Sequence, residues 1–596
     1  MMEENSAMPG KHSPLLFLAA LEICLGQTPH RPAIYSLSGE LRPQVIQLDK
    51  LSAGSAYSFL FSVNNLPPSA RIAVSITEAG RVSLSKTLHA GDADLYAPIR
   101  PHAAAALRIT AEGAPAATYR LQINRVPFAA PGHNWQDAAP MSLGQLIVAS
   151  NDELEYFPLP GTSRKAIVET PAADHWYRFD FDAPRPKLVF FQLELTDRDD
   201  LPVDVSIFRE SGRKLTEFTD GQDPVAMPHE VQALLGNKFA PRLLKDRGTY
   251  YVRVRANHPE YKLRTRIYEA PPYDDPHDAV RTAIDYIMGA GDSWFANTPR
   301  RGGAFDRVSG VHQETSLCVA CHASHFSQRA QLYGTANGYP VVQRQQLQFL
   351  EERFYNNPRP FYGFEKQSAV WSRVISAPAN VLSRMSVLTS LFEDNVSGVP
   401  KPAYHDGLAA YLKLYYSGRD KLPPDETNGN TPLVSAHEVA WYSWKTTRDP
   451  KLADMISQGD VKNLVDLCYQ TLALAEIDPT KYAAQIRANA DRLLSLQRPS
   501  GQWSMRFDPK EPEVEFQTGH ALWALSAAGI PKDNPQVAKT IAYLLSHQTS
   551  FGGWMDPLQS FENFKTPFRE TQFAVLALSS YFPLAGREKG WDAPPL

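Results

Sequence analysis

The sequence predicts a multidomain protein of mixed class, in which β-strands come first and helices follow. Up to about residue 268, short segments alternate apolar and polar side chains with a period of two, the pattern of half-buried strands. Beyond residue 277 the period becomes helical, and a helix–turn–helix unit recurs. We therefore expect β domains in the first half of the chain and a helical domain in the second.

Length and composition are those of an ordinary globular protein. The chain has 596 residues, of which 43% are hydrophobic and 21% are charged, and its formal net charge is -4. This length allows about three or four domains, each with its own core. A small negative charge gives no electrostatic attraction to nucleic acid or to an anionic membrane surface, so neither partner is expected.

Residues 1–26 have the features of a secretory signal peptide. A Lys-His pair precedes an apolar run over residues 14–25, whose length suits a signal-peptide core and is too short for a membrane span. Cleavage before Gln27 would place the small residues Cys24 and Gly26 at the third and first positions before the cut. The alternative is a disordered tail with a short buried helix. Once the signal is removed, we expect a periplasmic or extracellular protein without a transmembrane span.

Two β-sandwiches are expected, over residues 27–126 and 145–268, with a connection rich in Pro and Gly between them. Both regions have an early strand of the pattern Tyr-x-Phe-x-Phe and a late strand that contains a Thr-Tyr pair, which indicates that the two are related. These early and late strands lie at residues 57–63 and 118–123 in the first region, and at 176–181 and 248–254 in the second. A Pro-rich linker at residues 269–276 ends the second region.

The second β region resembles the bacterial pre-peptidase C-terminal domain. In that family a strand similar to residues 176–181 opens the fold, and a Gly-x-Tyr-x-Val-x-Val strand similar to residues 248–254 closes it. The resemblance implies an extracytoplasmic accessory module rather than an active site.

The helical part contains two clear copies of one unit, at residues 493–525 and 544–578. In each copy a helix that ends in Gln is followed by a Gly-x-Trp turn, a loop and an Ala/Leu-rich helix suited to burial. These copies resemble the repeats of squalene cyclases and protein prenyltransferases. The resemblance implies an α/α toroid of about six helix pairs over residues 277–596. This region lacks an Asp-x-Asp-Asp motif, so the acid-initiated cyclisation of class II terpene cyclases is not expected.

Two thiols three residues apart, Cys318 and Cys321, are followed at once by the imidazole of His322. Cysteines at this spacing can form thioethers to both vinyl groups of a haem while the histidine supplies the proximal iron ligand. The pattern resembles the attachment motif of c-type cytochromes, which implies one covalent haem c per chain. The other cysteines, Cys24 and Cys468, have no close partner, so a zinc site would lack its second pair of ligands. A thioredoxin-like pair would need a βαβ context that the flanking sequence does not offer.

The second axial position of a haem iron decides between electron transfer and chemistry. His437 and His520 lie near the starts of two other expected inner helices, so either could be the distal ligand, or an ordinary hydrogen-bonded structural histidine. A polar loop at residues 355–365 could bind propionates through Arg359 or be a simple turn. The remaining candidates are His312, His405, Met385, Met505 and Met555. His325 follows His322 by three residues, which puts it on the same side of the haem plane and makes it a poor distal ligand.

Together these features predict a redox protein that passes electrons through His322-ligated iron to a partner that the sequence does not identify. Two alternatives stay open. One is a haem enzyme of the oxygenase or peroxidase type that acts on a small molecule in the toroid cavity. The other is a module that binds a small apolar ligand there.

Overall fold

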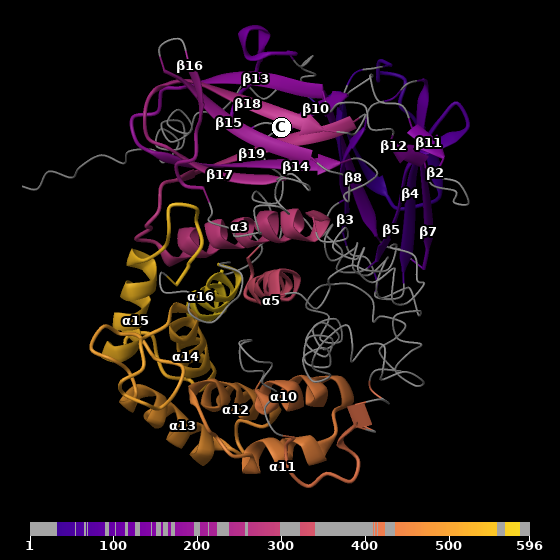
Figure 1. The fold of residues 1–596 in the computed structure, drawn as a ribbon. Coiled ribbons are helices and arrows are strands. Elements are labelled where there is room, and N and C mark those ends of the chain that lie inside the picture. Colours follow the sequence, from indigo (N-terminus) through magenta and orange to yellow (C-terminus); the bar gives the residue numbers. More distant parts are fainter. Residues whose placement is uncertain are drawn as a thin grey trace, which may run out of the picture. The chain divides into compact units, whose positions relative to one another are not determined.

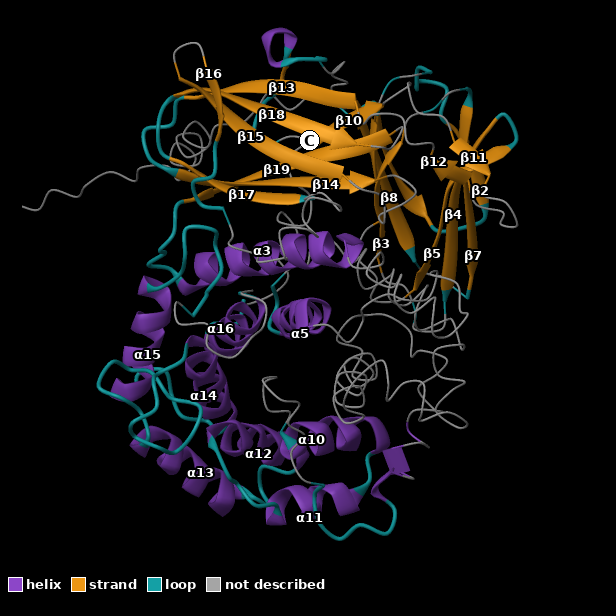
Figure 2. Ribbon diagram, viewed as in Figure 1, coloured by secondary structure: helices purple, strands orange, loops and turns teal. Residues whose placement is uncertain are grey.

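The computed structural model describes residues 33–125, 132–297, 322–339, 409–423, 435–556 and 567–584, with short breaks inside these ranges. Apart from two short segments, the chain divides at Val126 into two compact units, the second of which comprises Pro127–Leu596. Figure 1 follows the chain by colour, and Figure 2 separates its strands from its helices.

The first unit contains two four-stranded sheets. The strands of one sheet, in order across it, are β1 (Tyr35–Glu40), β8 (Thr118–Arg125), β3 (Tyr57–Asn64) and β6 (Leu95–Ile99). Those of the other are β2 (Gln44–Gln47), β7 (Ala105–Glu112), β4 (Arg71–Glu78) and β5 (Arg81–His89). The predicted early and late strands are confirmed as β3 and β8, which pair antiparallel with Phe59 opposite Ile123. Alternate side chains such as Phe59, Phe61 and Leu121 are fully buried, because successive residues of a strand point to opposite faces.

The second β region belongs to the second unit and has two larger sheets. One sheet has, in order, β10 (Leu146–Ser150), β19 (Glu260–Glu269), β14 (Lys187–Leu195) and β17 (Phe239–Leu244). The other has β16 (Lys214–Glu217), β15 (Val203–Ser211), β18 (Gly248–Ala256), β13 (Ala173–Phe181) and β9 (Ala139–Pro140). A small hairpin, β11 (Tyr156–Pro158) and β12 (Lys165–Ile167), stands apart from both.

One hydrophobic core joins the two sheets of this region, with Phe191 and Leu263 from one sheet and Phe179 and Val252 from the other. The predicted early and late strands are confirmed as β13 and β18, and they pair antiparallel as β3 and β8 do in the first unit. The region begins earlier than residue 145, since β9 pairs with β13.

The helical region shows two kinds of helix. α12 (Leu464–Ile477), α14 (Glu515–Ala527) and α16 (Phe568–Tyr581) are buried around most of their circumference, whereas α11 (Pro450–Gln458), α13 (Ala483–Ser495) and α15 (Pro535–Ser546) bury one face only. The buried helices pack on one another and, at either end, on α10 (Ala436–Thr447) and α5 (His322–Ala336). No helix in the described ranges has the length and apolarity needed to cross a bilayer.

The two sequence copies fold alike, which confirms the repeat. Trp503 donates from Nε1 to the carbonyl of Leu493, and Trp554 donates in the same way to Leu544, both at 2.8 Å. Each Trp therefore ties the turn that follows α13 or α15 back to the last turn of that helix.

The second β region and the first helix, α3 (Pro276–Asn297), share a core despite the Pro-rich connection between them. Leu188 and Phe190 belong to the same hydrophobic cluster as the helical region. Asp285 of α3 is buried, accepts a hydrogen bond from Tyr268, and pairs with Arg266 Nη1 at 2.8 Å. The connection at residues 269–276 thus leads from one layer of a common core to the next.

Candidate functional site

His322 is the first residue of α5. Cys318 and Cys321 lie outside the described residues. α5 packs against both α3 and α16, and the hydroxyl of Ser327 donates to the carbonyl of Ile287 in α3 at 2.9 Å. The backbone at His322 therefore belongs to a helix that is fixed within the helical region.

Arg329 lies seven residues after His322, which is two helical turns along nearly the same face of α5 and about 10 Å of axial rise. Its Nη1 donates to Glu438 Oε1 at 2.9 Å and to the Tyr469 hydroxyl at 3.2 Å, and its Nε donates to Gln572 Oε1 at 2.8 Å. The Tyr469 hydroxyl donates to Glu438 Oε1 at 2.8 Å. We call these four buried residues the Arg329 cluster.

The Arg329 cluster draws on four helices at similar depths. Arg329 is the eighth residue of α5, Glu438 the third of α10, Tyr469 the sixth of α12 and Gln572 the fifth of α16. The cluster therefore lies in the N-terminal halves of α10, α12 and α16 and at the middle of α5. Burial opposes the charge of Arg329, but Tyr469, Tyr442 and Glu438 raise its pKa above the ordinary value.

His520, the sixth residue of α14, lies beside the Arg329 cluster. Its ring centroid is 4.3 Å from that of Tyr469 and 4.4 Å from that of Phe573. Complete burial, with the nearby Arg329 charge, lowers its pKa well below 6.5, so the imidazole is neutral at pH 7. Neither ring nitrogen has a hydrogen-bond partner in the part of the chain that the structure describes. This imidazole is held between two aromatic rings, edge-on to Tyr469 and stacked on Phe573.

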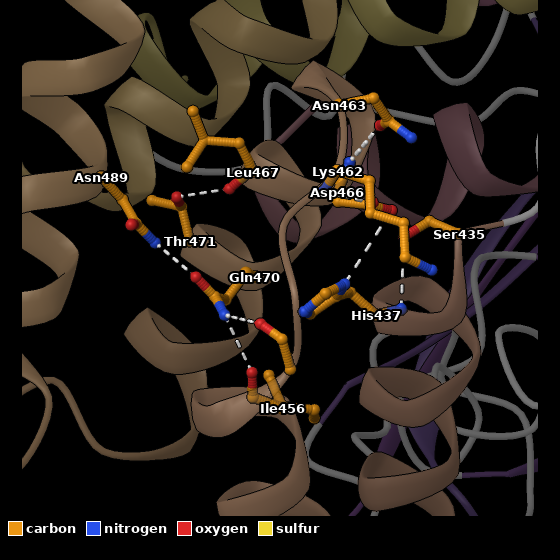
Figure 3. A network of polar contacts seen from close by, with 11 residues as sticks. Ser435, His437, Ile456, Lys462, Asn463, Asp466, Leu467, Gln470, Thr471 and Asn489 are labelled. Carbon is orange, nitrogen blue, oxygen red and sulfur yellow. Dashed lines mark hydrogen bonds and ion pairs between the residues drawn. The ribbon is translucent and has the colours of Figure 1, made fainter. Parts of the chain in front are cut away.

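His437 has different surroundings from its neighbour Glu438. Its Nδ1 is 3.9 Å from Asp466 Oδ1, and a methyl group on Gly459 would come within 2.7 Å of its Nε2. Figure 3 shows His437 and Ser435 converging on Asp466, whose Oδ1 accepts from the Ser435 hydroxyl at 2.6 Å. His437 therefore packs against the loop before α12, whereas Glu438 reaches α5.

Burial alone would raise the pKa of Asp466, but its contacts with His437 and Ser435 lower it below the ordinary value. Asp466 is therefore a buried carboxylate that stays ionised, and it fixes the start of α10 to the start of α12. Further along α12, Gln470 donates to the Ile456 carbonyl at 2.9 Å and accepts from Asn489 at 3.0 Å, as Figure 3 also shows. This polar network serves the packing of the helices.

The other candidates are scattered. Met505 is buried and Met555 is partly buried, and both pack in the hydrophobic core, while His325 lies one turn after His322 in α5. The candidates outside the described residues are His312, His405, Met385, Arg359 and the loop at 355–365. Within the described ranges, no three His, Cys, Asp or Glu side chains come together as a metal site would require.

Sequence reasoning missed the Arg329 cluster. Arg329, Glu438 and Gln572 are polar residues in helices that bury apolar side chains, which is a signal visible in the sequence, although each of these helices also carries other polar residues. The spacing of seven between His322 and Arg329 was a second signal, because it places both residues on one helix face. Neither signal identifies the partners, which lie 109 and 243 residues further along the chain.

Comparison with known proteins gives one family match. A family model described as the squalene-hopene cyclase C-terminal domain matches residues 434–581. This segment is similar to that domain. The match covers α10 to α16 and supports the predicted squalene cyclase-like fold of these helices. No curated protein matches the sequence.

Two solved structures illustrate the level of similarity. A protein of Salmonella enterica serovar Paratyphi A, described as a possible member of the GH105 family, is 11% identical over 53% of this chain and 85% of its own, with a TM-score of 0.24. A rhamnosidase from Klebsiella oxytoca is 11% identical over 73% of this chain and 94% of its own, with a TM-score of 0.17. Similarity at this level says nothing about the function of the chain.

Proposed function

We propose that this chain is an exported c-type cytochrome with a single haem, which passes electrons through an iron ligated by His322. Thioethers from Cys318 and Cys321 would hold the haem, and His322 would be the proximal ligand. The observation that carries the proposal is the Cys-Val-Ala-Cys-His sequence, which ends on the first residue of α5. The haem would supply the one-electron chemistry, and the helices would orient it and exclude water.

His520 is the better candidate for the second axial ligand. A metal ligand must be a neutral imidazole with a free nitrogen, and His520 is neutral, rigidly stacked and without a partner among the described residues. His520 also lies near Arg329, and Arg329 belongs to α5, the helix that begins at His322. Both ring nitrogens of His437 also lack a hydrogen-bond partner among the described residues, but Nδ1 faces the Asp466 carboxylate at 3.9 Å and Gly459 lies against Nε2. A second histidine ligand favours electron transfer over chemistry at the iron.

The helical region is proposed to close into an α/α toroid of about six helix pairs. One support is that α16 packs against α5 and α3, so the last described pair meets the first. Another is that Gln548 donates to the Ala279 carbonyl of α3 at 3.0 Å, as Gln497 donates to the Gln536 carbonyl of α15 at 2.8 Å. The last pair is thus joined to the first by the same contact that joins consecutive pairs.

The proposed location is the periplasm or the extracellular space. The support is the signal-like segment at residues 1–26, together with the haem motif, since c-type haem is attached outside the cytoplasm. In such a protein the β region at residues 145–268 would be an accessory module of the pre-peptidase C-terminal type. The redox partner would be another extracytoplasmic electron carrier.

The visible spectrum of the reduced protein tests the proposal, recorded before and after addition of carbon monoxide. We expect covalent haem in the wild type, none in the Cys318→Ala, Cys321→Ala double variant, and no response of the wild type to carbon monoxide. His520→Ala should open the iron to carbon monoxide, whereas the matched variant His437→Asn should not. Absence of covalent haem from the wild type, made with haem-maturation machinery, would refute the cytochrome function.

Other outcomes favour the alternatives. A wild-type spectrum that responds to carbon monoxide would favour the haem enzyme that acts on a small molecule in the cavity. A folded protein that never takes up haem would leave the module that binds a small apolar ligand.

A further inference from the structure

The two copies of the helical unit differ in the turn that contains the Trp. In the first copy residues 500–503 read Ser-Gly-Gln-Trp, with Ser500 exposed and Gln502 half-buried. In the second copy residues 551–554 read Phe-Gly-Gly-Trp, and all four are buried. Both Trp side chains make the same hydrogen bond to the preceding helix, so the fold of the turn itself does not account for the difference. The second turn must instead meet something that the first does not.

The first partner of the second turn is α3. The ring centroid of Phe551 is 5.0 Å from that of Tyr286 in α3. A methyl group on Gly553 would come within 2.7 Å of the Tyr286 ring, so the Gln that stands at this position in the first copy would not fit. A methyl group on Gly552 would come within 2.8 Å of Thr282, also in α3. The second turn is therefore adapted to lie closely against this helix.

The second partner of the turn is β14. A methyl group on Gly552 would lie 3.1 Å from Leu188 and 3.3 Å from Phe190, and both of these side chains are fully buried. At the equivalent Gly501 the three nearest atoms all belong to Lys539 of the following helix, α15. A strand of the second β region thus contacts the turn of the last described pair, in addition to the helix that begins the first.

β17, the neighbour of β14, extends the contact along α3. A methyl group on Gly289 of α3 would come within 2.4 Å of the Phe239 ring. The Phe239 ring centroid is 5.1 Å from that of Phe190 and 6.0 Å from that of Tyr286. These rings form one apolar layer between the sheet and the helices, and burial of apolar surface is the main force that holds such layers together.

We infer that the second β region is a clamp that holds the last described helix pair against the first. The face formed by β14 and β17 contacts α3 and the turn after α15 at one place, so it spans the junction between the two pairs. Phe551 and Gly553 are the residues that adapt the second copy to this contact. The connection at residues 269–276 is then a tether only, because the packed surface by itself keeps the two regions together. The clamp consists of described residues and does not depend on the haem.

Cutting this connection tests the inference on the full-length protein. A protease recognition site can be inserted between Asp274 and Asp275, which are both exposed. After cleavage of the folded protein, the two pieces should still elute together from a size-exclusion column. Phe190→Ala should weaken their association at least about tenfold on dilution, because it removes a large buried side chain from the contact. Two folded pieces that separate in the wild type would overturn the inference.

Phe208→Ala is the matched control. Phe208 belongs to the other sheet of the same β region, where its ring centroid is 5.2 Å from that of Trp176 and where it lies outside the core shared with the helices. This variant should leave the association of the cut pieces unchanged. An equal loss in Phe208→Ala and Phe190→Ala would mean that the β region as a whole is weakened, and the clamp would be refuted.

A second measurement keeps the chain uncut. The double variant Phe551→Ser, Gly553→Gln gives the second turn the residues of the first. Amide hydrogen exchange should then accelerate at least about tenfold in the middle of α3 and in β14, since the packing that protects them is lost, while α12 keeps its wild-type rates. Unchanged exchange in α3 and β14, or an equal acceleration in α12, would overturn the inference.

Discussion

Arg329 and Glu438 form a buried ion pair, with 2.9 Å between Nη1 and Oε1, although 109 residues separate them in the chain. The pair joins α5, which carries His322, to α10. Two charges lose their hydration on burial, so such a pair adds little stability over a well-packed apolar pair, but losing one partner is costly. The fold therefore retains a polar arrangement at its centre that packing alone does not require.

Removing one partner of this pair should destabilise the protein strongly. Glu438→Ala leaves the Arg329 charge unpaired and should cost about 3 to 5 kcal/mol in the free energy of unfolding. The double variant Arg329→Met, Glu438→Leu should recover most of this loss. Glu511→Ala is the control, because it breaks the surface pair with Arg506 at 3.0 Å and should cost no more than about 1 kcal/mol. Urea unfolding of the haem-free protein measures all four proteins, and equal losses in Glu438→Ala and Glu511→Ala would contradict the prediction.

His520 should make the haem-free protein sensitive to acid. Because its pKa in the fold lies well below 6.5, only the unfolded chain takes up the proton as the pH falls below that value. The contribution of His520 to the free energy of unfolding is therefore fully present above pH 6.5 and declines below it, by up to about 1.4 kcal/mol per pH unit. His520→Phe should remove this component, whereas replacing the exposed His547 by Gln should not. Urea unfolding between pH 7 and pH 5 measures this. If the free energy of unfolding of His520→Phe fell with pH as steeply as that of the wild type, the prediction would be wrong.

The local elements of the fold were predictable from the sequence, and the reason is periodicity. β3, β8, β13 and β18 have the alternation of strands with one buried face, and the two helix copies have the same Gln and Gly-x-Trp spacing. Each pattern lies within a short stretch of chain. A periodic pattern therefore reports which face is buried but not what covers it.

The sequence did not predict contacts between side chains that lie far apart in the chain. The Asp285 site, where Tyr268 and Arg266 meet α3, fuses the second β region to the helices, yet the Pro-rich connection suggested separate cores. Likewise, His437 and His520 looked alike as starts of inner helices. Their rings differ because one meets Asp466 and the other lies between two aromatic rings. Such pairings depend on how the helices pack, which no single stretch encodes.

Glu515 should make the protein less stable at alkaline pH. Burial, despite the hydrogen bond from Tyr543, raises the pKa of Glu515 from 4.5 to about 7, and Asp556 adds to the rise. The fold thus favours the protonated form of Glu515. Its contribution to the free energy of unfolding is fully present below pH 4.5 and is lost as the pH rises to about 7. This difference in pKa corresponds to roughly 3 kcal/mol at pH 8.

Glu515→Gln tests this, because an amide cannot ionise. The variant should be more stable than wild type at pH 8 and similar to it at pH 5, as measured by urea unfolding. Asp533→Asn, a change on an exposed loop, should leave the pH dependence unaltered. If wild type and Glu515→Gln had the same pH dependence between pH 5 and pH 8, Glu515 would not have the raised pKa.

Gln548 should hold the last described helix pair to the first. Its Nε2 donates to the Ala279 carbonyl at 3.0 Å and to the Gly552 carbonyl at 2.7 Å, so Gln548→Leu leaves two carbonyls without this donor and should cost about 1 to 3 kcal/mol. The loss should be local, because Ala279 lies in the first turn of α3. Amide hydrogen exchange should therefore accelerate in the first turns of α3.

The matched variant Gln497→Leu removes the equivalent contact with the Gln536 carbonyl, and it should accelerate exchange at the start of α15 instead. If Gln548→Leu accelerates exchange only in α3 and Gln497→Leu only in α15, each Gln links its own repeat to the helix that begins the next pair. A uniform increase across α3 and α15 in either variant would argue against this, because the two contacts would then stabilise the helical region as a whole rather than joining particular pairs.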